Sequence, residues 1–337
     1  MDITSCLPMN TVHAIGSTSS GICAVIQDEM RKKHPAPYVS FSHVPPALVR
    51  ESLDNPEAFG SRAVRICYDE DTRRLIVKIP GNQHEVATWH LSKRIINDTT
   101  SMGLDDQLLL KGAARVEDAP VKKEPDASFR PVHRPPGRDQ KWPSVVIESG
   151  WSESDARLEV DANLWIGRSE GLVQVVIAVC IDRDQELVTF KKYVPAQAPL
   201  PRLQTLRSHS WRAALSETIA VSRVNQVVTV TGAPLTIRFE EMFLRPASSP
   251  LHVGYTFDAA ALQKVAEMAR GRLAGAVWAG SPCEGGQEVT GAPFVIRFED
   301  MFLRPARGTF EMDYVFDAER RQSLAELVWD EGSDVSD

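Results

Sequence analysis

The stretch that decides the fold is Trp142-Pro143-Ser144-Val145-Val146-Ile147-Glu148-Ser149-Gly150. Its β-branched apolar run is bounded by Pro143 and Gly150, which is typical of a short buried strand. Glu148 ends that run, and a buried carboxylate is costly unless it is paired or holds a cation. A second carboxylate, Asp126, follows a proline 22 positions earlier. If the two lie on adjacent strands, they can share one hard divalent ion such as Mg²⁺.

The flanking segments predict the other elements of an α/β core. Strands are expected at Ala63–Tyr68, Leu75–Ile79, Leu108–Leu110 and Leu187–Tyr193, and helices are expected from His84 to Ile96 and after Ser152. Val173–Ile181 is almost continuously apolar, which favours a central strand that is buried on both faces. Residues 112–141 are rich in proline and charge, so they are predicted to form a mobile loop around Asp126.

At these residues the chain resembles the PD-(D/E)XK nuclease-like superfamily, and it looks closest to a group of fungal proteins of restriction-endonuclease-like fold. The resemblance covers roughly residues 40–195, and it is carried by Pro125-Asp126, the Trp142–Glu148 run, Ser152-Glu153-Ser154 and the upstream His84-Glu85. It implies a mixed sheet of the restriction-endonuclease type flanked by helices, built in the order helix, strand, strand, helix, strand.

The resemblance also implies an activity, which is Mg²⁺-dependent phosphodiester hydrolysis on DNA. Asp126 and Glu148 would hold the metal, and Glu85 would assist from the first helix. The motif places a lysine two residues after the glutamate, where this chain has Gly150. Lys191 is the candidate substitute, so the implied catalytic set is Glu85, Asp126, Glu148 and Lys191, with Lys141, Lys192, His84 and Asp161 as further candidates.

Structural roles compete with each of these assignments. Asp126 could be an Asx-turn residue, Glu148 could be paired with an arginine, and Glu85 could lie on a solvated helix face. At the level of function, the alternative is a catalytically inactive binding or scaffold protein of the same fold, which Gly150 favours. A third class is an interaction module built on the internal repeat. A cluster of three carboxylates within reach of one metal ion would favour the enzyme, and an arginine filling the space between them would favour the inactive form.

That internal repeat lies in the C-terminal third. Residues 231–247 recur at 290–306, with 14 of 17 positions identical. Each unit predicts a strand, a short loop, a strand and a helix, so we expect a β-rich C-terminal extension at 229–329 with units at 231–270 and 290–329. One copy would pack on the core while the other is appended or meets a protein partner. The remaining divisions are a segment of uncertain order at 1–40, a core at 41–228 and an acidic tail at 330–337.

Net charge and cysteine content limit the expected partners, metal sites and cellular compartment. The net charge is −7, which is not the signature of a dedicated nucleic-acid binder, although residues 111–141 hold 8 basic and 5 acidic side chains. The five cysteines form no CxxC pair, which argues against a zinc site and favours a reducing compartment. No apolar run approaches the length of a membrane span. We therefore expect an intracellular protein of the cytoplasm or nucleus, without a membrane.

Overall fold

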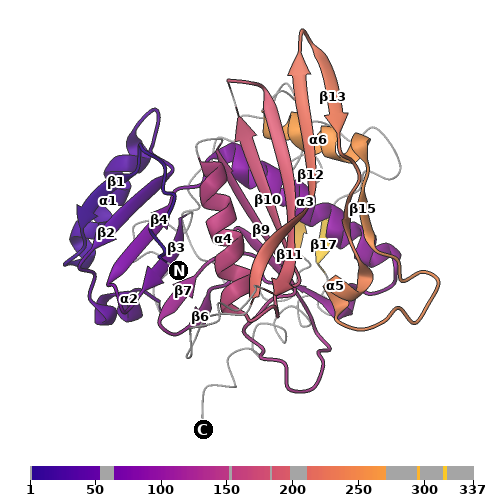
Figure 1. Cartoon of the computed structure of the whole chain (residues 1–337), viewed down its shortest axis with the longest axis horizontal. Helices are drawn as coiled ribbons and strands as arrows, with labels where there is room; N and C mark the ends of the chain where they lie inside the picture. Colours follow the sequence, from indigo (N-terminus) through magenta and orange to yellow (C-terminus); the bar gives the residue numbers. More distant parts are fainter. Residues whose placement is uncertain are drawn as a thin grey trace. The chain divides into compact units, whose positions relative to one another are not determined.

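The computed structural model describes residues 2–53, 64–151, 154–182, 184–197, 211–270, 294–296 and 314–316. Within the chain, residues Met1–Arg272 form one compact unit and Leu273–Asp337 form a second. The first unit contains two large sheets with helices packed on their faces, so the expected α/β class with mixed sheets flanked by helices is confirmed (Figure 1).

The sheet that carries the motif has seven strands in the order β13-β12-β11-β10-β9-β8-β5. Its strands are β5 (Leu108–Leu110), β8 (Ala127–Pro131), β9 (Val145–Trp151), β10 (Val175–Asp182), β11 (Leu187–Gln197), β12 (Trp211–Val224) and β13 (Val227–Thr231). β9 and β10 are parallel, and the other neighbours are antiparallel. With α3 (Asn82–Ser101) and α4 (Asp155–Arg168), the chain order is α3, β5, β8, β9, α4, β10, which has one more strand before α4 than the order that the resemblance implies.

Strand alternation assigns the two faces of this sheet to different helices. Val145 and Ile147 of β9 pack with α3, whereas Val146 packs with Leu158 and Trp165 of α4. The same alternation continues along β10, which is why its sequence is apolar at nearly every position. Because Glu148 and Gly150 share the face of Val146, they are directed toward α4.

The second large sheet has six strands in the order β1-β2-β4-β3-β7-β6. Its elements are β1 (Val12–Ile15), α1 (Ser19–Arg31), β2 (Tyr38–Ser42), α2 (Pro46–Leu53), β3 (Arg65–Asp69), β4 (Arg74–Lys78), β6 (Val116–Asp118) and β7 (Val121–Lys123). Leu75 and Val77 pack with the α1 side, whereas Ile76 packs with Val160 and Leu164 of α4. Helix α4 is therefore covered by a sheet on each side.

Two expectations differ from this arrangement. The segment 1–40 supplies β1, α1 and the start of β2, and thus part of a sheet. The predicted mobile loop at 112–141 was wrong, because it contains β6, β7 and β8. The charged and proline-rich composition hid short strands whose apolar residues, such as Val116, Val121 and Phe129, are buried. A short 3₁₀ helix, Asp105–Gln107, precedes β5.

The repeat forms the same hairpin in both copies. In the first copy, β14 (Leu235–Ile237) pairs with β15 (Tyr255–Phe257), and in the second, β16 (Phe294–Ile296) pairs with β17 (Tyr314–Phe316). Leu235 lies opposite Phe257, just as Phe294 lies opposite Phe316. The first copy also contains α5 (Phe239–Phe243) and α6 (Ala259–Ala269). The remainder of the second copy and the acidic tail lie outside the described residues.

The first copy closes the α3 face of the seven-stranded sheet. Its residues Ile237, Phe243 and Phe257 are buried in the same core cluster as Leu91 and Ile95 of α3. Polar contacts fix its position, because the Tyr255 hydroxyl lies 2.8 Å from the Thr99 hydroxyl and Ser144 Oγ donates to the Met242 carbonyl at 2.7 Å. The first copy is therefore an integral part of the folded core.

This difference between the copies can be tested with equivalent substitutions. Ile237→Ala removes fully buried side-chain atoms and is expected to lower the free energy of unfolding of the first unit by about 2–5 kcal/mol. The matched control is Ile296→Ala in the second copy, which should leave that unfolding transition unchanged. Urea denaturation followed by circular dichroism measures both. An equal loss in the two variants would contradict the assignment of the first copy to the core.

Candidate functional site

The structure brings Asp126 and Glu148 together around a lysine. Asp126 directly precedes Ala127, which pairs with Ile147 across the antiparallel strands β8 and β9. Lys78 enters from the end of β4, and its Nζ lies 2.6 Å from Asp126 Oδ2 and 3.3 Å from Glu148 Oε2. All three residues are at least nine-tenths buried. The two carboxylates thus share one cation, which is an ammonium group of the chain itself.

A second lysine extends the cluster toward α4. Lys123 of β7 places its Nζ 3.1 Å from Glu148 Oε1 and 2.9 Å from Asp161 Oδ1. Trp165 Nε1 donates to the same Glu148 oxygen at 2.8 Å, and Arg157 pairs with Asp161 at 2.9 Å. Both Glu148 oxygens therefore have partners, and charges of opposite sign alternate through the space between the two sheets.

The pKa shifts of Lys78, Lys123, Asp126 and Asp161 favour the charged form of each group. Burial by itself raises the pKa of Asp126, but Lys78 and the hydrogen bond from the Ser149 amide outweigh it and lower that pKa. Burial opposes the charge of Lys78 and Lys123 as well, yet the facing carboxylates raise the pKa of both ammonium groups. Arg157 and Lys123 likewise lower the pKa of Asp161 against the effect of its burial.

Glu85 lies in the first turn of α3. Its carboxylate is not part of the group that Asp126 and Glu148 form around Lys78. Its Oε1 accepts from Arg65 at 3.1 Å, and the same guanidinium has its Nε 3.9 Å from Asp126 Oδ1. Burial raises the pKa of Glu85, although half of the side chain is exposed. His84 accepts from the Gly81 amide and packs on Trp151, with ring centroids 4.2 Å apart.

The candidate substitutes for the motif lysine lie elsewhere. Lys191 is paired with Asp155 at 2.6 Å, at the start of α4. Lys192 is paired with Glu241 at 3.0 Å, and Lys141 with Asp118 at 3.0 Å. At the motif position itself, a Cβ on Gly150 would lie 3.3 Å from Leu158 and from Ser154 Cβ. Close packing of α4 on β9 therefore explains the glycine.

These residues do not fit a divalent metal ion. Mg²⁺ needs about six oxygen ligands and usually keeps several waters, whereas the space between the carboxylates holds the Lys78 ammonium. The cavity beside Lys78, Lys123 and Asp161 has a volume of only about 10 Å³. Within the described ranges, no group of three or more His, Cys, Asp or Glu side chains is arranged to hold a metal.

Sequence reasoning missed Lys78 and Lys123. A usable signal existed, because Lys78 follows Leu75-Ile76-Val77 and shares the face of Ile76, so its side chain is directed inward. Lys123 shares the face of the buried Val121 in the same way. A lysine at an inward position of a strand requires a buried anion. The sequence analysis had already identified Asp126, Glu148 and Asp161 as candidate anions.

The comparisons with known proteins supply no argument about this chain. No protein-family model and no curated protein sequence matches this chain. One solved structure that resembles it is described as a "putative nuclease belonging to DUF820" from Anabaena variabilis. The two chains are 16% identical over 45% of this chain and 88% of the other, with a TM-score of 0.29. A likeness of that size carries no conclusion about activity.

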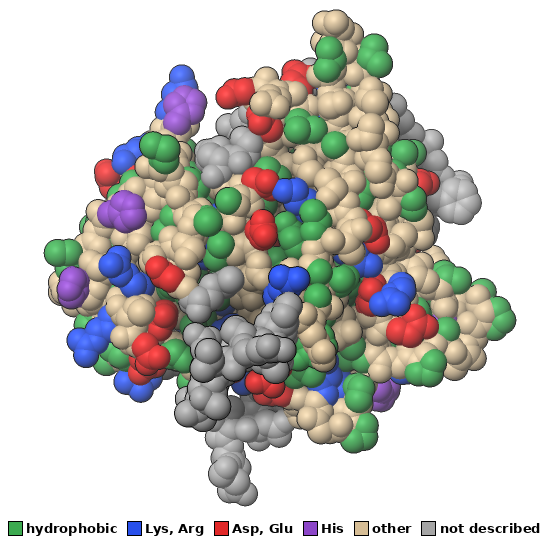
Figure 2. Space-filling view, viewed as in Figure 1, with side chains coloured by type: hydrophobic (Ala, Val, Ile, Leu, Met, Phe, Trp, Pro, Cys, Tyr) green, Lys and Arg blue, Asp and Glu red, His purple; other side chains and the backbone are tan. Residues whose placement is uncertain are grey.

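The surface charge bears on binding to DNA, and the length and polarity of the helices bear on binding to a membrane. On the face drawn in Figure 2, basic and acidic side chains are interspersed over the described residues. The helices that the structure describes include none that is both long and apolar enough to cross a membrane.

The lysine cluster predicts a large stability effect. Lys78→Met leaves Asp126 and Glu148 buried without their shared cation and is expected to cost about 3–5 kcal/mol, because an uncompensated charge remains. The matched control is Lys122→Met, since Lys122 pairs with the half-exposed Glu117 and should cost about 1 kcal/mol or less. Denaturant unfolding measures both. Similar losses in the two variants would show that the buried pair adds no special stability.

The lowered pKa values of Asp126 and Asp161 predict how the free energy of unfolding falls at acid pH. A carboxyl group with a depressed folded pKa contributes stability above its unfolded pKa, about 3.9, and loses it as pH falls through the folded value. Stability should therefore hold above about pH 5 and decline below pH 4. Asp126→Asn removes one titrating group, so its free energy of unfolding should fall less between pH 5 and pH 3. Parallel pH profiles would contradict the ionised network.

Proposed function

We propose that this chain is a catalytically inactive nuclease-like protein that acts by binding. The observation that carries the proposal is the position of Lys78, whose Nζ contacts Asp126 and Glu148 at 2.6 and 3.3 Å. A permanent cation on the chain replaces the exchangeable ion that phosphodiester hydrolysis requires. The carboxylates keep a structural role, which is to join the two large sheets through ion pairs.

Burial supports the same conclusion. Glu148 is 1% exposed, and its Oε1 is already engaged by Trp165 and Lys123. An incoming metal would have to displace an ammonium group from a site without room for the metal's waters. A metal-bound water also needs an open side that faces the substrate, and α4 together with the six-stranded sheet covers this cluster.

Mg²⁺-dependent hydrolysis of DNA is the second candidate function. One observation favours it, because Lys78 contacts both carboxylates and could therefore take the role of the missing motif lysine. In that case, movement of the six-stranded sheet would have to open the cluster. The two candidates differ in metal affinity and in the effect of removing Lys78.

Calorimetric titration with Mg²⁺ and Mn²⁺ separates them. We expect no binding to the wild type at about 1 mM metal and no nicking of supercoiled DNA, with the Glu148→Ala variant giving the same two results. If Lys78→Met remains folded, it is expected to gain weak metal binding, because it frees two carboxylates that already lie close together. Lys122→Met is the control for a general loss of positive charge.

The opposite pattern would overturn the proposal. Metal-dependent nicking by the wild type that disappears in both Lys78→Met and Glu148→Ala, but persists in Lys122→Met, would show that Lys78 serves catalysis. Gly150→Lys adds an independent check. The new side chain is directed toward Leu158 and Ser154, so we expect it to disturb the packing of α4 and to restore no activity.

A further inference from the structure

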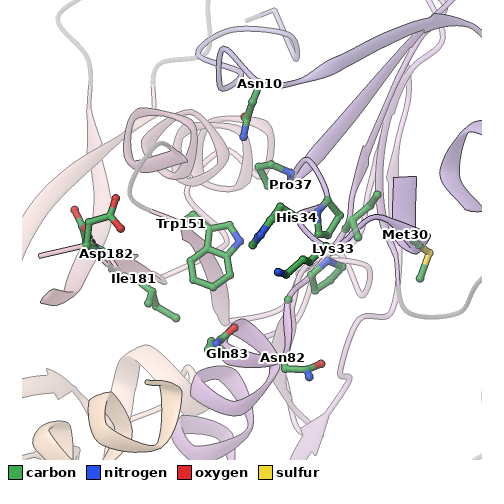
Figure 3. A pocket seen from close by; sticks show the side chains of 15 residues that line it. Asn10, Met30, Lys33, His34, Pro37, Asn82, Gln83, Trp151, Ile181 and Asp182 are labelled. Atoms are coloured by element: carbon green, nitrogen blue, oxygen red, sulfur yellow. Dashed lines mark hydrogen bonds between the residues drawn. The ribbon is translucent and has the colours of Figure 1, made fainter. Parts of the chain in front are cut away.

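A cavity of about 620 Å³ lies at the carboxyl ends of the parallel strands β9 and β10 (Figure 3). Trp151 ends β9, and Ile181 and Asp182 end β10, while Lys33 and His34 come from the connection between α1 and β2. Ligands of open α/β sheets bind outside the carboxyl ends of parallel strands, and ligand pockets typically measure about 300–1,000 Å³. The cavity therefore has both the place and the size of a ligand site.

Trp151 is held rigidly within this cavity. A Cβ on Gly81 would lie 3.0 Å from Trp151 Cζ2, so the indole packs directly on the backbone that precedes α3. The His84 ring supports it with a centroid separation of 4.2 Å. The ring nevertheless remains partly exposed, and it lies in the middle of the cavity in Figure 3. A fixed and accessible aromatic face is a platform on which a planar ring can stack.

The charges around Trp151 differ from one side of the cavity to the other. Lys33 and His34 lie on one side of the indole, and Asp182 lies on the opposite side (Figure 3). The Asp182 carboxylate is oriented by backbone amides, because its Oδ1 accepts from Asp184 and Gln185 at 3.0 Å each. A complementary ligand therefore has an anionic end, a planar ring, and hydroxyl groups that can donate to a carboxylate.

We propose that this cavity binds a nucleoside 5′-phosphate group. The base stacks on Trp151, the phosphate lies against Lys33 and His34, and the sugar hydroxyls donate to Asp182. The same chemical unit occurs in a free nucleotide and at the 5′ end of a nucleic-acid strand. The proposal rests on the binding role proposed above, but it uses none of the residues of the lysine cluster.

The test is calorimetry on the full chain with three probes: AMP, adenosine, and a short single strand that carries a 5′ phosphate. EDTA is present throughout, so the result is independent of whether Lys78 excludes metal. We expect AMP or the strand to bind with a Kd below about 1 mM. Binding of AMP alone assigns a free nucleotide, and binding of the strand alone assigns a strand end.

Two substitutions assign the contacts. Trp151→Ala should weaken binding by about 5- to 150-fold, because stacking of one base contributes about 1–3 kcal/mol. Lys33→Ala should weaken the binding of the phosphate-bearing probes by about fivefold and leave the binding of adenosine unchanged, since only the phosphate is anionic. Matched controls are Trp89→Ala and Lys93→Ala, an exposed tryptophan and a partly buried lysine on α3 that contact each other outside the cavity.

The proposal is overturned if neither AMP nor the strand binds to the wild type. It is equally overturned if Lys33→Ala and Lys93→Ala weaken binding to the same extent, because the charge would then act from the general surface. Thermal melting shows whether Trp151→Ala folds. If it does not, the binding of AMP and of adenosine to Lys33→Ala decides the outcome. Lys33 lies on an exposed connection, so its substitution should not disturb the fold.

Discussion

The ion pair of Lys78 with Asp126 and Glu148 is the interaction on which the arrangement of the first unit depends. A buried carboxylate must be compensated by a cation, and in this chain the cation comes from a different sheet. The pairing therefore joins the six-stranded sheet to the seven-stranded sheet through charged groups. Apolar contacts of α4 join the same two sheets, because Leu158 packs with Val146 and Val160 packs with Ile76.

Lys123, Asp161 and Arg157 extend this constraint along α4. Arg157 also donates to the carbonyl groups of Ile3 and Ser5, so the N-terminal segment is tied to the same network. Alternation of charge keeps each buried ion next to an opposite one, which is the condition for retaining ions away from water. The cluster is thus a structural junction between chain segments that lie more than a hundred residues apart.

The duplicated segment forms the same hairpin in each of the two compact units of the chain. The first copy supplies Ile237, Phe243 and Phe257 to the core and seals one face of the motif-bearing sheet. The hairpin register of the second copy is the same, and that copy belongs to the second compact unit of the chain.

Much of the fold could be predicted from local pattern. The apolar run ending at Glu148, the doubly buried run of β10 and the repeat each identified an element, because side-chain periodicity reflects burial directly. The short strands β6, β7 and β8 could not be predicted, since their proline and charge content is also that of a loop. Their stability comes from pairing with partners that are distant in the sequence.

For the candidate site, the sequence by itself grouped Asp126 and Glu148, which do lie close together, with Glu85, which is half exposed and pairs with Arg65 instead. It placed Asp126 and Glu148 beside a sheet and left the identity of their cation open. Only the tertiary structure decided that this cation is Lys78, because the lysine is 48 positions from one partner and 70 from the other. Local pattern specifies burial of a charge, whereas the choice of the neutralising partner depends on how separate sheets pack.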